Sequence, residues 1–175
     1  MSEPEFSRPV RADTIGTAPR AMEIAAEPAE RQALVRRFGL SALDRLEAEL
    51  SVVRADQDVI VSGTLSATLT QACVVTADAV PDEIEEHFEI LFRQEPESAG
   101  GDEEVELDER EMDVIFYDGA SVDVGEAVAQ SLALALDPYP RAPGALDALK
   151  NSGVMEPGEA GPFGALAGLK DKLGK

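Results

Sequence analysis

The sequence predicts an α+β fold: a single domain in which one antiparallel β-sheet of about six strands packs with two main helices and a short C-terminal helix. Two observations lead to this class. Several segments alternate apolar and polar residues with period two, and two others carry apolar residues at helical spacing beside capping residues. The length of 175 residues and an apolar fraction of 44% suit one folded domain. Strand order, and whether the sheet is curled or barrel-like, stays open.

The first third of the chain predicts two strands, a helix and a third strand. Residues 6–13 contain Pro9, which suits an edge strand, and residues 20–27 alternate around Met22 and Ile24. A helix follows over residues 28–38, because Pro28 is tolerated in a first helical turn and Gly39 suits the position after the last. Period two from Leu46 to Val53 then predicts a brief turn and a strand, although Ser41 and Asp44 resemble a capping box.

The central segments are rich in β-branched residues. Residues 58–76 read as one long strand, bent at Gly63, with a hairpin turn at Gln57–Asp58. Residues 84–92 and 112–117 predict two further strands, the second followed by a turn.

One more main helix is predicted after Asp123, which suits its N-cap, and Pro138 and Pro140 end it. Its apolar stripe consists of Val124, Ala127, Val128, Ser131, Leu132 and Ala135. Residues 141–162 read as loop. Residues 163–173 place apolar side chains at helical spacing and predict the short C-terminal helix, which must dock on its own domain or on a partner.

The domain organisation follows from composition. We expect one α+β domain over residues 1–148, interrupted by a flexible acidic connector at residues 94–111, and a Gly- and Pro-rich tail over residues 149–175.

The charge is strongly negative and unevenly placed. The net charge is −20, and residues 55–148 carry 23 acidic side chains against three arginines. Such a chain repels phosphate backbones and anionic membranes, and it favours basic proteins as partners. One cysteine excludes an internal disulfide, and the chain has neither a run of 18 apolar residues nor an apolar leader, so we expect a cytoplasmic protein without membrane contact.

No motif predicts catalysis, a cofactor or a metal site. The chain has no Gly-rich phosphate loop, and its single histidine excludes a histidine-based metal cluster. His87 is interpreted as a solvated strand residue, with a general base as the alternative. Cys73 is interpreted as a small buried hydrophobe. We therefore expect no enzymatic activity; a small hydrolase or nuclease would need a metal cluster or a nucleophile–base pair.

Three segments together carry a family resemblance. TLSATLTQACVVT, then YDGASVDVGEAVAQSLALALDPYP, then PFGALAGLK resemble the YceD family, the large ribosomal RNA subunit accumulation proteins, in its alphaproteobacterial form. The resemblance covers residues 6–170. It implies a bacterial, cytoplasmic factor for accumulation or processing of large-subunit ribosomal RNA, with no established enzymatic activity. Many members carry C-x-x-C where this chain has Cys73 and Thr76, so the resemblance gives no support for a metal here.

Two hypotheses follow for how such a factor acts in ribosome assembly. In the first, an acidic surface binds a basic ribosomal protein or a pre-ribosomal large-subunit particle. The residues predicted to make this contact are Glu103, Glu104, Glu106, Asp108, Glu109, Tyr139 and Arg141. In the alternative, a local basic patch binds the precursor ribosomal RNA directly, with help from Lys170 and Lys172. The residues of that patch are Arg31, Arg36, Arg37 and Arg45.

Overall fold

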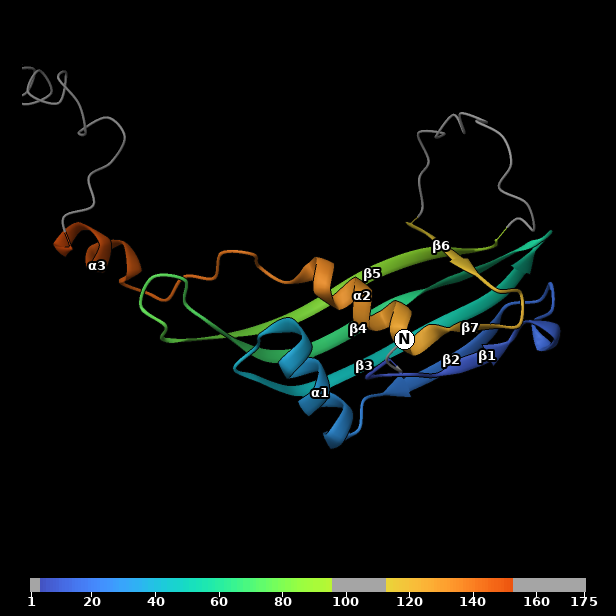
Figure 1. Ribbon diagram of the computed structural model, residues 1–175, viewed down its shortest axis with the longest axis horizontal. Coiled ribbons are helices and arrows are strands. Elements are labelled where there is room, and N and C mark those ends of the chain that lie inside the picture. Colours follow the sequence, from blue (N-terminus) through green and yellow to red (C-terminus); the bar gives the residue numbers. More distant parts are fainter. Residues whose placement is uncertain (1–3, 96–112, 153–175) are drawn as a thin grey trace, which may run out of the picture. The chain divides into compact units, whose positions relative to one another are not determined.

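The computed structural model describes residues 4–95 and 113–152 (Figure 1). These residues form two compact units, one from residues 4–71, 81–95 and 113–138 and the other from residues 72–80 and 139–152. The strands are β1 (Pro9–Arg11), β2 (Arg20–Ala25), β3 (Ala42–Ala55), β4 (Asp58–Ala72), β5 (Ala79–Gln94), β6 (Asp113–Tyr117) and β7 (Ser121–Asp123). The helices are α1 (Pro28–Phe38), α2 (Val124–Ala135) and α3 (Ala145–Asn151), with a 3-10 turn at Ala12–Thr14.

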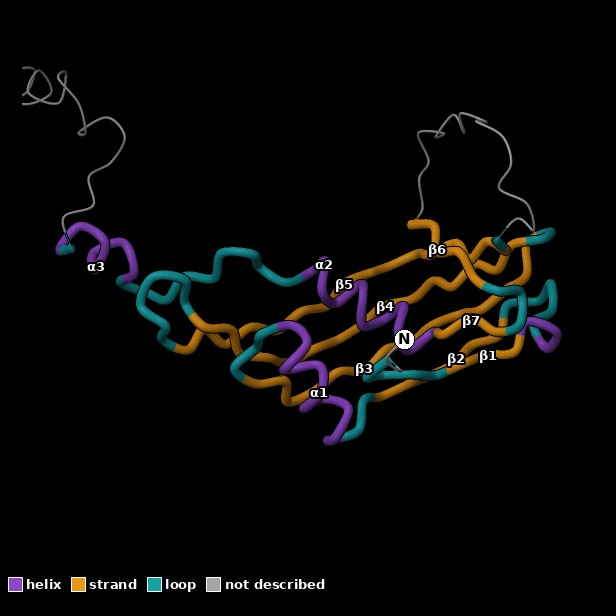
Figure 2. Tube along the Cα trace, in the orientation of Figure 1, coloured by secondary structure: helices purple, strands orange, loops and turns teal. Residues whose placement is uncertain are grey.

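The larger unit contains a five-stranded sheet in the order β2-β3-β4-β5-β6 (Figure 2). The predicted α+β class is confirmed, and the sheet is open rather than barrel-like. β2 with β3 and β3 with β4 pair antiparallel, as expected. β6 instead runs parallel to β5, so the sheet is mixed. The physical reason is the connection: parallel neighbours need a crossover of a dozen residues or more, and a long segment separates Gln94 from Asp113.

A second, two-stranded sheet joins β1 to β7, antiparallel, with Val10 opposite Val122. β1 lies within the predicted edge segment. β7 was not predicted, because three residues between a turn and a helix cap are too few to show a period.

Both main helices begin and end as predicted from their capping residues. At the start of α1 the Glu30 carboxylate accepts the backbone N–H of Glu27 at 2.7 Å, and Gly39 ends the helix with φ 66°. At the start of α2 the Asp123 side chain accepts the N–H groups of Gly125 and Glu126.

The core lies between the two helices and one face of the five-stranded sheet, which α1 and α2 both cover (Figure 1). Leu34 of α1 and Val128 and Leu132 of α2 are fully buried against inward side chains of the strands, such as Leu65. The predicted stripe of α2 is buried apart from Ala135, which is half-buried. Gly63 is needed for close strand approach: a Cβ there would lie 2.3 Å from the Glu49 carbonyl oxygen.

Two predictions in the smaller unit were wrong. The strand expected to reach Thr76 ends at Ala72. Cys73 lies in the turn that follows, where its carbonyl accepts the N–H of Ala77 at 2.9 Å. Residues 145–151, expected as loop, form α3, whose first turn packs Ala145 with Cys73 and Ala142. Seven residues show too little periodicity to be recognised from sequence.

The expected C-terminal helix and the acidic connector lie outside the described residues, and the domain boundary at residue 148 stays a prediction.

Candidate functional site: the outer face of the sheet

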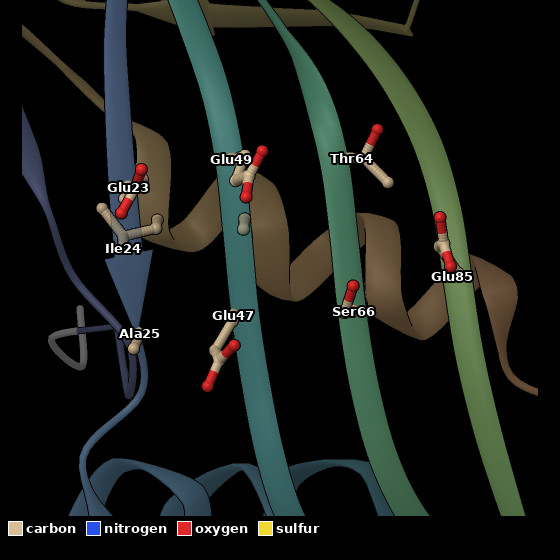
Figure 3. Close-up of a pocket in the computed structure, with 9 residues that line it drawn as sticks. Glu23, Ile24, Ala25, Glu47, Glu49, Thr64, Ser66 and Glu85 are labelled. Atoms are coloured by element: carbon tan, nitrogen blue, oxygen red, sulfur yellow. The ribbon is translucent and has the colours of Figure 1, made fainter.

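Four strands place polar side chains on the sheet face opposite α1 and α2. Because successive side chains of a strand point to opposite faces, each inward Leu or Val alternates with an outward polar residue. Figure 3 shows the outward side chains in the middle of this face, with α2 behind the sheet. We call the outward glutamates and hydroxyls the acidic face: Glu23 on β2, Glu47 and Glu49 on β3, Thr64 and Ser66 on β4, and Glu85 on β5.

The acidic face is a shallow concavity with hydroxyls as its floor. In the register of β3 and β4, Glu49 lies opposite Thr64 and Glu47 lies opposite Ser66. The glutamates of β2 and β3 lie to one side of these hydroxyls and Glu85 lies to the other (Figure 3). All four glutamates are exposed. Such a surface offers carboxylates on both sides to a cation or to the donors of a basic side chain.

The electrostatics of the acidic face oppose folding. Glu23 and Glu49 are directly opposite each other in the antiparallel register, an arrangement in which like charges destabilise a sheet. Among the described residues no cation forms an ion pair with Glu23, Glu49 or Glu85. Only Glu47 has one, with Arg45 at 3.6 Å. The face therefore carries negative charge that the rest of the described unit leaves uncompensated.

His87 borders this face. It is exposed, as expected for a solvated strand residue, and it lines a neighbouring shallow hollow with Glu49 and Ser62. In the part of the chain that the structure describes, no three or more His, Cys, Asp or Glu side chains are grouped as a metal site would require.

The predicted protein-binding residues do not belong to the acidic face. Glu103, Glu104, Glu106, Asp108 and Glu109 lie outside the described residues. Tyr139 and Arg141 are exposed, Tyr139 to 70%, and they belong to the smaller unit. Their role in binding stays a prediction.

The predicted arginine patch is largely engaged inside the fold. Arg37 donates to both carboxylate oxygens of Glu126 at 2.7 and 2.8 Å and to Glu5 at 2.9 Å. These bonds raise the pKa of Arg37 and lower the pKa of Glu126.

The other members of the patch are spread over two elements. Arg31 donates to the carbonyl of Ala26 at 2.6 Å, and Arg45 lies on β3 beside Glu47. Arg36 is exposed and has no described ion pair. Arg31 and Arg36 share a shallow groove between α1 and the start of β3, together with Asp44. One exposed guanidinium beside a carboxylate is a weak platform for a phosphate backbone.

Cys73 is buried in the smaller unit, as predicted, although in a turn. The pKa of the Cys73 thiol is lowered to about 7, mainly by a hydrogen bond with the Thr76 side chain and next by one with the backbone of Ala142. Cys73 packs with Ala142 and Ala145, and Val75 and Val80 lie against this small apolar cluster.

The acidic face was missed because its signal is spread over four strands. The alternation that predicted these strands already placed Glu47 and Glu49 on one side of β3 and Glu85 on one side of β5. The sequence alone does not indicate the register that sets Glu23 opposite Glu49, and it does not indicate which face of the sheet the helices cover.

The fold and this face together define an α+β protein with one helix-covered sheet face and one exposed acidic sheet face. The chain belongs to the YceD family: the model of the large ribosomal RNA subunit accumulation protein YceD matches residues 61–170. No curated protein and no solved structure gives a match. Within the described residues, no helix is long and apolar enough to cross a membrane. The family links the chain to accumulation of large-subunit ribosomal RNA; its alphaproteobacterial form stays a prediction.

Proposed function

We propose that this chain supports large-subunit ribosomal RNA accumulation as a non-enzymatic cytoplasmic factor in bacteria, and that its acidic face binds a basic ribosomal protein. The observation that carries the proposal is the pair Glu23 and Glu49, opposite each other without a described cation. Unpaired like charges cost stability at that register, and a bound Lys or Arg side chain would remove the cost.

Charge also argues for a protein rather than bare RNA. Ribosomal proteins that contact RNA are basic, and a net charge of −20 attracts them at long range. By covering basic side chains before assembly, the acidic face would prevent their premature contact with RNA. Direct RNA binding by the arginine patch is the weaker candidate, because Arg37 and Arg45 already pair with carboxylates.

The test is retention of proteins extracted from the large ribosomal subunit and freed of RNA with nuclease. The tagged chain is compared with a variant carrying Glu23→Gln, Glu49→Gln and Glu85→Gln. A matched control carries the same charge change away from the acidic face, in Asp44→Asn beside α1, Asp56→Asn in the β3–β4 turn, and Glu86→Gln on the helix-covered side of β5.

We expect the natural chain and the control to retain at least one basic protein, which elutes as salt is raised. The acidic-face variant should retain about tenfold less, since each lost charge-assisted contact is worth about 1.5–3 kcal/mol before screening. Equal retention by both variants would exclude the acidic face. Retention from an extract that was not treated with nuclease, but not from the nuclease-treated one, would favour RNA as the ligand.

A further inference from the structure

The strand β6 forms one end of the five-stranded sheet. It pairs with β5 on one side, and no described residue pairs with its other side. An end strand of this kind leaves a row of backbone N–H and C=O groups available for pairing with another extended chain.

The backbone direction identifies which residues of β6 face outward. Glu95 donates its N–H to the carbonyl of Tyr117 at 3.0 Å, so the Tyr117 backbone points toward β5. The N–H and C=O groups of successive residues point to opposite sides of a strand. The backbone groups of Ile115 therefore also point toward β5, whereas those of Val114 and Phe116 point to the open side of β6.

The same two residues expose apolar side chains. Val114 is 43% exposed and Phe116 is 59% exposed, whereas Ile115 and Tyr117 pack on the core. Val114 lies beside Leu91 in the register of β5 and β6, and Leu91 is only 8% exposed. The outer face therefore continues at β6 as an exposed apolar patch, defined by Val114 and Phe116 beside the buried Leu91, and its backbone edge is available in the described unit.

Charge decides what fits this edge. Exposed carboxylates bracket β6, with Asp113 at its start and Asp118 just after its end, and Glu89 precedes Leu91 on the same face of β5. None of these three has a described ion pair. A second copy of a chain with net charge −20 is repelled here, whereas an extended segment with Lys or Arg around an apolar residue is attracted.

We propose that β6 binds an extended basic segment of the partner protein by β-strand addition, pairing with the backbones of Val114 and Phe116. The apolar side chain of that segment packs on Phe116, and its flanking basic side chains meet Asp113 and Asp118. Main-chain pairing supplies affinity and the patch supplies selectivity. This inference rests on the proposed function for the identity of the partner as a basic ribosomal protein.

The probe is a panel of 12-residue peptides that tile the basic proteins of the large subunit, with binding followed by fluorescence anisotropy. Phe116→Pro removes the outward N–H without breaking a bond to β5, and proline is tolerated at a strand edge. Phe116→Thr is the matched control, because it removes the aromatic ring but keeps the donor and suits a strand. Far-UV circular dichroism and the unfolding midpoint establish that both variants fold.

We expect Phe116→Pro to weaken binding about tenfold or more and Phe116→Thr to weaken it less, since only the proline removes the backbone donor. Residue-resolved hydrogen exchange in the natural chain should show the Val114 and Phe116 amides exposed without peptide and protected with it. A variant that binds normally after Phe116→Pro, or amides that stay exposed in the complex, would overturn strand addition.

The remaining outcomes separate this inference from the proposed function. Amides that are already protected in the free chain mean that the chain covers its own edge, and protection that rises with protein concentration means self-pairing; either overturns the inference. If the Glu23, Glu49 and Glu85 variant loses binding but Phe116→Pro does not, the acidic face stands and strand addition fails. The reverse result supports strand addition and refutes the acidic face.

Discussion

The charges on the two faces of the five-stranded sheet are arranged in opposite ways. On the helix-covered side, two arginines bind carboxylates: Arg8 binds Glu30 through two bonds of 2.6 and 2.9 Å, and Arg37 binds Glu126 and Glu5. On the outer side, Glu23, Glu49 and Glu85 have no described cation.

This difference separates charges that hold the fold from charges that are available to a partner. The matched groups are half-buried and join segments distant in sequence, so each contact fixes tertiary structure. Glu23, Glu49 and Glu85 form no ion pair within the described residues, and the opposed pair Glu23 and Glu49 raises the free energy of the sheet. Changes on the first side should therefore affect stability, and changes on the second should affect binding.

The largest loss of stability is expected from Asp123→Ala. Its carboxylate accepts the Ser7 hydroxyl at 2.6 Å, the Arg8 N–H at 2.7 Å, and two N–H groups of α2. Removing it abolishes both the helix cap and the attachment of the N-terminal segment, so we expect the free energy of unfolding to fall by about 3 kcal/mol. Urea denaturation measures this.

Asp118→Ala is the control for that prediction. Asp118 is an exposed turn residue that accepts one N–H, from Ala120 at 2.9 Å. Its loss should cost less than about 1 kcal/mol. Similar effects of the two variants would mean that the N-terminal segment is not held through Asp123.

A smaller loss is expected from Arg37→Gln. The Arg37 side chain is 30% exposed and that of Glu126 is 20% exposed, so solvent screens part of the attraction and we expect a loss of about 1.5 kcal/mol. Arg36→Gln, at the adjacent exposed position without a described ion pair, should change stability by less than about 0.5 kcal/mol.

The pH dependence sharpens the same comparison. Arg37 lowers the pKa of Glu126 in the folded state, so the pair stabilises the fold above the usual carboxyl range and loses its effect as the pH falls through the lowered value. Natural and Arg37→Gln chains should therefore differ most near pH 7, and the difference should shrink as the pH falls below the usual carboxyl range. A constant difference between them across this range would show that Arg37 acts through packing alone.

How much of this could be predicted from the sequence depends on how far apart the interacting residues are. α1 and the start of α2 were predicted residue for residue, because Pro28, Gly39 and Asp123 act on backbone groups within one turn. The pairing of Arg37 with Glu126 joins residues 89 positions apart, and nothing local indicates it. The same limit hid the parallel pairing of β6 with β5, which depends on how the chain crosses between them.

The acidic face shows a second limit. Alternation indicated that Glu47 and Glu49 share one side of β3, but charge density along the chain pointed to residues 94–111 instead. The density of acidic residues along the sequence reflects only residues that are close in the chain. Glu23 and Glu49 become neighbours only through the β2–β3 register. A surface built from one or two residues per strand becomes visible only once the register is known.

The smallest expected effect has the opposite sign to the others. Neutralising both glutamates of the opposed pair, with Glu23→Gln and Glu49→Gln, should raise the free energy of unfolding by about 0.5 kcal/mol at low salt, because it removes a like-charge contact between neighbouring strands. The gain should shrink toward zero near 1 M salt, where the screening length is about 3 Å. Glu47→Gln is the control, since Glu47 lies opposite Ala25 and pairs with Arg45, and it should not stabilise the chain. Urea denaturation at both salt concentrations measures the two variants and the natural chain. A double variant that is less stable than the natural chain at low salt would indicate a compensating cation at the pair. That result would remove the main argument for the acidic face as a binding surface.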